Sequence, residues 1–523
     1  MELNTVKDAF GAALPDDGTT FDVLIAGAGP TGLALAIDLT RRGVRTLLVE
    51  RQDRLSPGAR GTGVQPRTQE VYDDLGVLDA VRAAGGRYPH TAWWENGRIA
   101  KVAEMIEQVD PTPAVPHSNT LMVPQFRNVE LLYERLQELG GDVLFDTELT
   151  SFDQDSTGVT ARLRRADGAE RTVRGAYLVA SDGGRSTVRR ALGLTMSGPS
   201  LAPGAVLLAD VRVSGLDRDH WHRWELPDVG FVALLPLAGT DYFQTFIAIF
   251  TEEPDTSPET VRARLAAHTH LAPEQIDEVL WASIYRPKAG MVDTYRTGRV
   301  FLAGDAAHIH SPAGGQGLNT SVQDAYNLGW KLGQVLRHGA PDTLLDTYDA
   351  ERRPIAEHIL DTSTRLHRSG NWRRGRDLHQ LGIGYPDSPL TRELRTDLAE
   401  GTPAAGDRAP DAPCTTADGT PTRLFDAFRG PHFTLLDLGG TGVDNSALPA
   451  DPALLRLVRV GGPTPDLIDA DGHIRDAYGP HSAVLLIRPD GYLALAAPPE
   501  DATAQVAAAL ETYLGAGAVP AAR

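Results

Sequence analysis

The first predicted domain begins with an apolar run that is followed by a helical pattern of apolar positions. Residues 21–26 form a compact apolar segment bounded by glycine, which predicts a buried β-strand. In residues 30–42 the apolar side chains recur on one helical face, and Gly43 follows as a typical C-terminal stop. A second apolar run at 44–50 predicts another strand. Together the three segments predict a βαβ unit whose first turn is rich in glycine.

Further along the chain, the same patterns predict a mixture of helices and strands. Helices are predicted at residues 127–140, 321–338, 343–366 and 503–513. Strands are predicted at residues 142–152, 159–164, 171–180, 204–213, 230–236, 241–250, 432–438, 454–460, 482–487 and 492–496. The β-rich, aromatic block at 203–290 is interrupted at 221–224, and it indicates a sheet outside the βαβ core. Residues 401–413 are rich in Pro, Gly, Ala and Asp and mark a linker.

Composition argues against several classes of function. The chain has 523 residues, enough for roughly two to four domains. Its 50 basic and 69 acidic residues give a formal charge of −19, which argues against nucleic acid or an acidic membrane surface as the main partner. No apolar run approaches the roughly 18 residues that span a bilayer, and the N-terminus lacks the pattern of a signal peptide. The single cysteine, Cys414, leaves no internal disulfide or thiolate cluster, so we expect a cytoplasmic protein without a metal site.

The glycine-rich turn has the residues that dinucleotide binding requires. Gly27 permits a tight turn, Gly29 lets the backbone approach a pyrophosphate, and Gly32 lets helix and strand pack closely. Free N–H groups at the start of the helix, which Pro30 and Thr31 open, bind phosphate. Glu50 ends the next strand, where a carboxylate accepts hydrogen bonds from both ribose hydroxyls. This arrangement predicts an unphosphorylated ribose, as in NAD or FAD.

A second signature decides between these two cofactors. Gly304 and Asp305 follow the apolar run 299–303, so Asp305 ends a predicted strand. A carboxylate there suits a hydrogen bond to a ribitol hydroxyl, a group that NAD lacks. The following glycine-rich segment, 314–319, can present backbone N–H groups to the edge of a flavin ring. The sequence therefore predicts FAD.

With these motifs the chain resembles the single-component FAD-dependent aromatic hydroxylases, the class A flavoprotein monooxygenases. The resemblance runs from about residue 20 to about residue 370 and includes segments 27–32, 50–51, 58–68, 181–189, 299–308 and 348–354. The tail resembles the C-terminal thioredoxin-like domain of the polyketide and phenol hydroxylase branch. One departure is at 125–130, where many relatives have Thr before the Glu.

The resemblance implies an α/β fold, with a Rossmann-like FAD-binding domain interleaved with a β-sheet substrate domain and followed by a thioredoxin-like α/β domain. The expected division is a flexible arm at 1–20, the FAD-binding domain at 21–85, 118–195 and 291–370, the substrate-binding sheet domain at 86–117 and 196–290, a connecting helix or linker at 371–404, and a thioredoxin-like domain without a Cys-x-x-Cys pair at 405–523.

Residue by residue, the resemblance also implies a cofactor site. Arg51 and Arg60 would contact the adenosine and diphosphate region, and Gln125 would contact the ribityl chain. Asp182 would serve both FAD and the nicotinamide cofactor, and Pro312 would lie at the ring edge. The loop at Gly61–Gly63 would flank the isoalloxazine ring of the flavin. The full expected set is Gly27, Gly29, Pro30, Thr31, Gly32, Glu50, Arg51, Arg60, Gln125, Asp182, Gly304, Asp305, Pro312, Gly315, Gly317, Leu318 and Asn319.

The activity implied by the resemblance is hydroxylation of an aromatic substrate, of polycyclic polyketide type. FAD would be bound tightly without a covalent link. NAD(P)H, with NADPH favoured, would reduce it transiently, which agrees with the absence of a second glycine loop from the sequence. Molecular oxygen would then form a flavin C4a-hydroperoxide as the hydroxylating agent. Family habit also allows a homodimer.

The sequence assigns no catalytic residue. A phenol reacts faster as phenolate, so a base near the substrate would help. His222 and Tyr242 of the predicted substrate sheet and Pro312 are the candidates, with His308, His310 and Tyr285 as further residues of suitable type; His308 is better interpreted as structural. Aromatic residues that can line a flat pocket are Trp93, Trp94, Trp221, Trp224, Phe231, Phe243 and Phe246.

Three other functions remain open on this scaffold. They are Baeyer–Villiger insertion of oxygen beside a ketone, inactivation of an antibiotic by monooxygenation, and binding of an aromatic ligand or partner by a non-catalytic flavoprotein. A flavin halogenase is disfavoured, because the chain has no Trp-x-Trp-x-x-Ile run.

Overall fold

The computed structural model describes most of the chain. The described residues are 14–59, 61–198, 205–249, 255–286, 288–311, 314–369, 375–440, 443–444, 446 and 448–515. Most of the arm expected at 1–20, and the expected site residues Arg60 and Pro312, lie outside this set. Within it, no helix has the length and apolarity that a membrane crossing needs.

The first sheet is built around five parallel strands. Its order is β17 (Arg296–Thr297), β18 (Val300–Leu302), β10 (Glu170–Ala180), β1 (Thr20–Ala26), β2 (Thr46–Val49) and β7 (Val143–Leu144), and β9 (Val159–Arg165) and β8 (Thr147–Gln154) extend it from β10. β18, β10, β1, β2 and β7 run parallel to one another. Their apolar residues are buried, as expected of strands covered on both faces.

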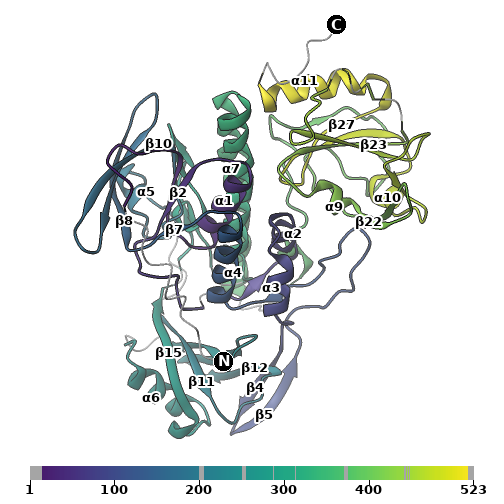
Figure 1. Ribbon diagram of the computed structural model, residues 1–523. Helices are drawn as coiled ribbons and strands as arrows, with labels where there is room; N and C mark the ends of the chain where they lie inside the picture. Colours follow the sequence, from purple (N-terminus) through teal and green to yellow (C-terminus); the bar gives the residue numbers. More distant parts are fainter. Residues whose placement is uncertain are drawn as a thin grey trace.

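Three helices stand beside this sheet: α1 (Pro30–Arg41), α4 (Gln125–Glu138) and α7 (Gly317–His338) (Figure 1). α1 contacts both of the others. Its one fully buried charge, Asp38, pairs with Arg41 and Arg42 on the next turn. Shorter helices α2 (Pro66–Leu75), α3 (Leu78–Ala84) and α5 (Thr187–Ala191), the long α8 (Asp346–Ser369) and two small ribbons complete this part. The ribbons pair β3 (Gly63–Val64) with β6 (Leu121–Met122) and β16 (Gly290–Met291) with β19 (His308–Ile309).

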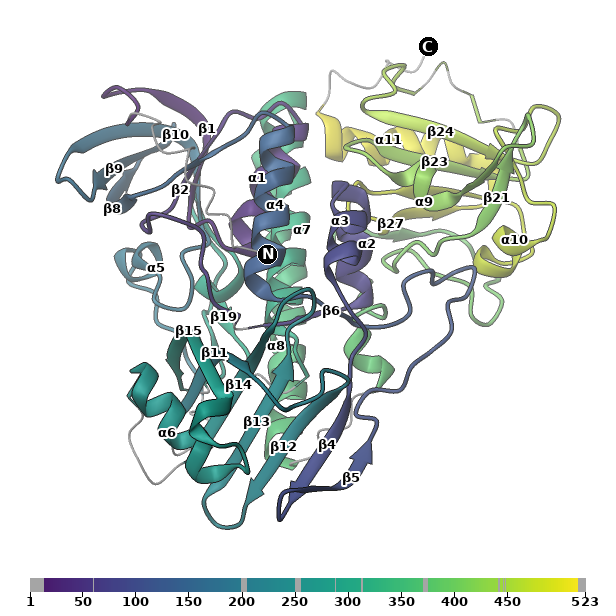
Figure 2. The same cartoon turned by 60° about the horizontal axis from the view of Figure 1, so that its bottom comes forward.

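A second, seven-stranded sheet lies below the helices (Figure 2). Its order is β15 (Ile276–Tyr285), β11 (Val206–Val213), β14 (Tyr242–Ile249), β13 (Gly230–Pro236), β12 (His220–Leu226), β4 (His90–Glu95) and β5 (Arg98–Ala103). All neighbours are antiparallel except β12 and β4. One face packs on α6 (Pro258–His268), and Val261 and Leu265 of this helix join its apolar core.

The C-terminal domain is a third sheet with its own core. Its order is β20 (Arg392–Glu393), β27 (Leu493–Ala497), β26 (Ala483–Ile487), β23 (Phe433–Leu438), β24 (Leu455–Val460), β25 (Leu467–Ile468), β21 (Pro413–Thr416) and β22 (Pro421–Arg423). β23 is parallel to β24 and β27 is parallel to β20, whereas β26 is antiparallel to both β23 and β27. The helices of this domain are α9 (Leu424–Phe428), α10 (His473–Tyr478) and α11 (Ala502–Leu514). The expected α/β fold class is confirmed.

Several local predictions are confirmed and several are wrong. The predicted helix at 30–42 and strand at 230–236 are α1 and β13. The predicted strand at 142–152 is two strands, β7 and β8, because Asp146 between them has a positive φ of 53°. The predicted interruption at 221–224 is wrong, since these residues lie inside β12. Residues 392–393, expected in a linker, form an edge strand of the C-terminal sheet.

An indole from α7 anchors the C-terminal domain. Trp330 is fully buried and packs edge-on against Phe433, with 5.7 Å between the ring centroids. It also meets Tyr513 of α11, at 6.3 Å. Large aromatic side chains make the greatest single contributions to such interfaces. The helix that begins at the predicted flavin loop therefore contributes Trp330 to the core of another domain.

We expect Trp330→Ala to loosen this anchor. Truncating a buried Trp costs about 3–5 kcal/mol, so the unfolding temperature should fall and residues 375–404 should become sensitive to protease. Thermal unfolding and limited proteolysis measure the two effects. The matched control is Trp93→Ala, which removes a half-buried indole from β4. Equal losses in both variants would contradict an anchoring role for Trp330.

Candidate active site

The carboxyl ends of neighbouring parallel strands bring the predicted cofactor motifs together. Ala26, the last residue of β1, lies opposite Val49 of β2 and Ala180 of β10. Ala180 in turn lies opposite Leu302 of β18. In open α/β sheets, ligands bind at this edge. The residues that follow the four strand ends are 27–32, Glu50, 181–182 and 304–305.

The first glycine loop is close-packed at two glycines and open at the third. Gly27 has a φ of +100°, a conformation that favours glycine. A Cβ on Gly32 would lie 2.0 Å from the carbonyl oxygen of Gly27. A Cβ on Gly29 would meet nothing within 4 Å. Gly29 precedes the N-terminus of α1, where free N–H groups attract anions, so the open side suits a pyrophosphate.

The carboxylate of Glu50 is fixed beside this loop. One of its oxygens, Oε2, accepts a hydrogen bond from the backbone N–H of Ala28 at 2.9 Å, and Oε1 accepts one from Gln52 at 3.0 Å. Each oxygen keeps a further lone pair for another donor. The side chain is half-buried and therefore remains accessible to a ligand at the loop.

The second signature packs directly on the first. Gly304 has a φ of +59°, and a Cβ there would lie 2.6 Å from Oγ1 of Thr31. Thr31 is in the first turn of α1, directly after Pro30. Asp305 comes next along the chain and is exposed. The close approach of Gly304 thus places the carboxylate of Asp305 near the start of α1.

A buried carboxylate holds the second signature in place. Asp324 of α7 accepts hydrogen bonds from the backbone of Gly304 at 3.1 Å and from Nε2 of His308 at 2.6 Å. Its other oxygen accepts one from Nε of Arg352 at 2.8 Å. Burial alone raises the pKa of Asp324, but the charges of His308 and Arg352 outweigh burial and lower it. His308 is therefore engaged in the protein interior.

Two polar side chains fix the loop that is expected to flank the flavin ring. Gln125, at the start of α4, accepts a hydrogen bond from the backbone N–H of Gly61 at 3.0 Å. Asn319 accepts one from the backbone of Gln65 at 2.8 Å and donates to the carbonyls of Gly63 and Gly315, both at 2.9 Å. Asn319 therefore ties this loop to the glycine-rich segment before α7.

Asp182 has a local structural contact. Its Oδ2 accepts hydrogen bonds from the backbone N–H groups of Thr187 at 2.7 Å and Val188 at 3.3 Å, at the start of α5. Its Oδ1 is buried and has no partner among the described residues. One oxygen of this carboxylate is thus used to cap the start of α5.

The other expected cofactor residues lie around the same edge. Arg51 is exposed beside Glu50, and Gly315 has a φ of +62°. Gly317 and Leu318 are the first residues of α7. Arg60 and Pro312 belong to the segments that the structure leaves undescribed.

The seven-stranded sheet separates its aromatic residues between two faces. Trp94, Trp224 and Phe243 belong to the core on the α6 side. Trp221 and Phe246 instead pack with Met122 and Tyr88, toward the cofactor-binding domain. Alternation along a strand produces this division. A flat ligand between the two domains would meet the face of Trp221 and Phe246.

His222 lies on the α6 face. It is fully buried; its Nδ1 accepts a hydrogen bond from Nε1 of Trp94 at 3.0 Å, and its Nε2 is 2.8 Å from the carbonyl oxygen of Asp217. Burial lowers the pKa of His222. Both ring nitrogens are occupied on the side away from the cofactor motifs, so the geometry favours a structural role.

Tyr242 lies near the flavin-flanking loop but at a strand end. Its hydroxyl donates to Oε2 of Glu278 at 3.0 Å, and the guanidinium of Arg212 lies over its ring. The ring packs with Ala59, Phe126 and Leu237. Burial and the bond to Glu278 raise the pKa of Tyr242, which makes it a poor base.

The sequence analysis missed Asp210 of β11. This residue is fully buried, and Oδ2 accepts a hydrogen bond from the backbone of Ala59 at 3.0 Å. Burial raises the pKa of Asp210 to about 7, against a smaller opposing effect of the Ala59 contact. The available signal was a single acid inside the apolar run 205–211. Buried acids of raised pKa concentrate at functional sites.

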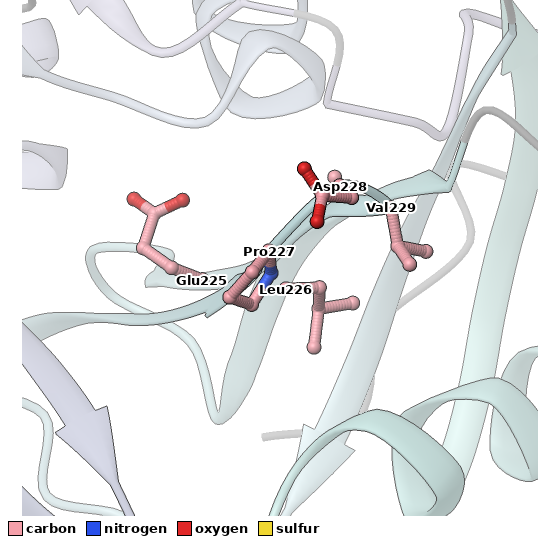
Figure 3. Close-up of a pocket in the computed structure, with 6 residues that line it drawn as sticks. Glu225, Leu226, Pro227, Asp228 and Val229 are labelled. Carbon is pink, nitrogen blue, oxygen red and sulfur yellow. The ribbon is translucent and has the colours of Figure 1, made fainter.

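One surface hollow is unrelated to these motifs. It has a volume of about 340 Å³ and is lined by residues 225–230. Figure 3 shows that the lining residues follow a single turn between β12 and β13. No other element contributes a polar group to it. Among the described residues, no group of three or more His, Cys, Asp or Glu side chains is placed to hold a metal ion.

Two family comparisons cover most of the chain. The FAD binding domain family matches residues 20–363, and the aromatic-ring hydroxylase C-terminal family matches residues 402–517. The chain belongs to the FAD-dependent aromatic hydroxylases. This assignment confirms the class A flavoprotein monooxygenase resemblance and an enzyme of that type.

Individual aromatic hydroxylases match along nearly their whole length. A flavin-dependent monooxygenase of Mycobacteroides abscessus is 40% identical over 90% of this chain and 96% of its own. The 12-dehydrotetracycline 5-monooxygenase/anhydrotetracycline 6-monooxygenase of Streptomyces rimosus is 36% identical over 95% and 99%. The crystal structure of aklavinone-11 hydroxylase with FAD and aklavinone superimposes with a TM-score of 0.78 at 29% identity, over 96% of this chain and 100% of that one.

The residues at the sheet edge of this hydroxylase fit FAD. Gly29 leaves an open approach at a helix N-terminus, and the half-buried Glu50 is fixed where a ribose would bind. Asp305 is exposed and follows Gly304, which packs against Thr31 in the first turn of α1. An elongated dinucleotide satisfies all three features together, since they lie along one edge of the sheet.

We expect Gly29→Ala and Gly32→Ala to separate binding from folding. The Cβ at Gly29 meets no protein atom, so the apoprotein should unfold at the wild-type temperature while the Kd for FAD rises at least about tenfold. The Cβ at Gly32 clashes with the Gly27 carbonyl, so that variant should lose stability, by about 1–3 kcal/mol or more. Thermal unfolding and flavin fluorescence measure these effects. Gly382→Ala, at an exposed and open position, is the control; unchanged FAD affinity in Gly29→Ala would contradict the assignment.

We expect Asp210→Asn to change how stability depends on pH. A raised pKa means that the folded state holds a proton which the unfolded state releases, so the stabilisation is present below about pH 4 and lost as the pH rises through about 7. The full effect is on the order of 4 kcal/mol. Asn resembles the protonated acid and removes this dependence. The variant should therefore gain in unfolding temperature relative to wild type between pH 5 and pH 8; a constant difference would contradict the raised pKa.

Proposed function

We propose that this hydroxylase uses NAD(P)H and O2 to insert one oxygen atom into an aromatic, polycyclic substrate of polyketide type. The observation that carries the proposal is the position of the aromatic face. Trp221 and Phe246 pack toward the cofactor-binding domain from a sheet that is separate from that domain. A planar substrate between the two would lie against rings on one side and the cofactor edge on the other.

The identity of the relatives supports the substrate class. One relative is named for its action on anhydrotetracycline, and the structurally similar aklavinone-11 hydroxylase was crystallised with aklavinone. Both are compared with this chain along more than nine-tenths of its length. We therefore assign a fused-ring phenol or quinone to this chain as its substrate class.

The protein's own part in the reaction is to bind, orient and exclude water. The N-terminus of α1 would hold the pyrophosphate, Glu50 the adenosine ribose, and Asp305 the ribitol. The N-terminus of α7 would place its N–H groups near the ring, where they stabilise negative charge. FAD, when bound, supplies the transfer of electrons from NAD(P)H to oxygen.

The overall reaction balances with one equivalent of each reactant. NAD(P)H gives two electrons, O2 gives one oxygen atom to the substrate, and the second oxygen leaves as water with two protons. No protein base is required if the substrate carries an ionisable hydroxyl beside the carbon that is oxidised.

We expect a matching ligand to accelerate the reduction of bound FAD manyfold. The measurement is anaerobic bleaching of the flavin's visible absorption by NADPH, with and without a panel of polycyclic phenols and quinones. Admission of ¹⁸O2 should then give a product with one labelled oxygen, and its structure separates ring hydroxylation from Baeyer–Villiger insertion. A stimulating ligand that gives no oxygenated product would instead favour a binding flavoprotein.

Two tryptophans of one strand provide a matched test of the substrate face. We expect Trp221→Ala to abolish most of the ligand stimulation, because this indole faces the cofactor-binding domain. Trp224→Ala, on the α6 face, should lower stability and keep the stimulation. The same reduction assay and thermal unfolding distinguish the two. Loss of stimulation in Trp224→Ala alone would place the substrate on the opposite face.

A further inference from the structure

Three residues on neighbouring strands of the seven-stranded sheet, here called the substrate-side sheet, contact one short loop. Asp210 on β11 lies opposite Gln244 on β14 and opposite Trp281 on β15. Paired residues of adjacent strands project to the same face. The row Gln244–Asp210–Trp281 therefore crosses the sheet on the side of Trp221 and Phe246. Each of the three side chains contacts Gly58 or Ala59.

The backbone of Ala59 is held from both sides by this row. Its N–H donates to Oδ2 of Asp210 at 3.0 Å, and its carbonyl oxygen accepts a hydrogen bond from Nε2 of Gln244. Asp210, Gln244 and Ala59 are all buried, with at most 1% of each side chain exposed. Such a double contact fixes both the position and the orientation of the peptide.

The neighbouring Gly58 fits against Trp281 without space for a side chain. A Cβ on Gly58 would lie 2.3 Å from Cε2 of the indole. The φ of Gly58 is not in the left-handed region, so the need for glycine comes from this contact. The indole thus sets the height of the loop above the sheet while the two polar side chains set its register.

The same loop is attached to the cofactor side a few residues later. Gly61 donates to Gln125 of α4, Gly63 pairs with Met122, and Gln65 donates to Asn319 of α7. Residues 58–59 therefore contact the substrate-side sheet, and residues 61–65 contact α4, β6 and α7. We call these described residues, 58–59 and 61–65, the bridging loop.

We infer that Asp210 is a positioning residue: together with Gln244 and Trp281 it forms the seat that holds the bridging loop on the substrate-side sheet. Through this loop, Asp210 couples that sheet to FAD binding and reduction. The part of this inference that concerns flavin reduction rests on the proposed function. The part that concerns loop position and FAD affinity does not depend on that function.

An acid at this position gives the seat a property that an amide would lack. Oδ1 of Asp210 is buried and has no partner among the described residues, so one hydrogen bond is the whole of the contact shown. Burial disfavours the ionised form of this carboxyl, so ionisation favours a state in which Asp210 reaches water. Ionisation of Asp210 should therefore loosen its contact with Ala59, and protonation should stabilise it.

The charged groups described near Asp210 are paired with one another, so we attribute the pH dependence of the seat to Asp210. On its own strand the next residue of the same face is Arg212, which pairs with Glu278 of β15 at 2.9 Å. Tyr242 of β14 donates to the same Glu278. On the side of the loop, Ala59 and Phe126, which pack together, carry no charge.

The test is hydrogen exchange of the segment 55–59 in wild type, Asp210→Asn, Asp210→Ala and Gln244→Ala, with and without FAD. Protection factors corrected for intrinsic exchange should fall about tenfold or more in Asp210→Ala and Gln244→Ala, which each remove one hydrogen bond of the seat. In wild type, protection should decrease as the pH is raised from 6 to 8. In Asp210→Asn it should be independent of pH. Asp437→Asn, a buried acid in β23, is the control and should match wild type.

FAD affinity and flavin reduction are measured in the same variants. We expect the Kd for FAD to rise about tenfold in Asp210→Ala, and we expect Asp210→Asn to restore part of the FAD affinity and of the ligand stimulation of flavin reduction at every pH between 6 and 8. Unchanged protection in both Asp210→Ala and Gln244→Ala would overturn the inference. Altered protection with unchanged FAD affinity and reduction would also overturn it. If wild type shows no ligand-dependent reduction, the proposed function fails, whereas the exchange and FAD affinity data still decide the role of Asp210.

Discussion

The buried carboxylate of Asp324 is the constraint on which the cofactor edge depends. It binds the backbone of Gly304, the imidazole of His308 and the guanidinium of Arg352 at once. Removing a partner from such a buried group is strongly unfavourable, because the remaining charge is left without compensation. Its three contacts come from the turn after β18, from β19 and from α8. The geometry of Asp305, and of the helix N-terminus that faces it, follows from this one group.

Adjacent residues of α8 extend this constraint to the C-terminal domain. Arg352 points to Asp324, while Glu351 binds Arg488 of the C-terminal domain at 2.7 and 2.9 Å and Lys331 of α7 at 2.7 Å. Arg488 is held in turn by Asp490. All of these side chains are buried. A single helical turn thus connects the cofactor edge to the third sheet through charges that are fully paired.

The parts of the site that depend on local sequence pattern could be predicted from the sequence. Strand, glycine turn and helix occur in succession at 20–41, so the roles of Gly27, Gly32 and Glu50 follow from spacing along the chain. Asp210, Gln244 and Trp281 form a group only through the register of three strands, and register is set by tertiary pairing. The spacing of these three residues along the chain does not indicate that they lie together.

The side of the sheet on which an aromatic residue lies depends on strand boundaries in the same way. Trp221 and Trp224 were predicted as one interruption, and only the strand β12 reveals that they face opposite directions. His222 shares the face of Trp224 for this reason. Residue type alone therefore could not show that Trp221 and His222, which are adjacent in sequence, lie on opposite faces of the sheet.

The position of Trp330 in α7 has a consequence for how this architecture can be recombined. The indole packs against Phe433 and Tyr513 of the C-terminal domain. Lys331 beside it pairs with Glu351, which also pairs with Arg488 of that domain. Exchange of the C-terminal domain between relatives must therefore carry the matching residues of α7 and α8 with it. The unit of modular exchange in this protein extends into the cofactor-binding domain and does not end at the linker.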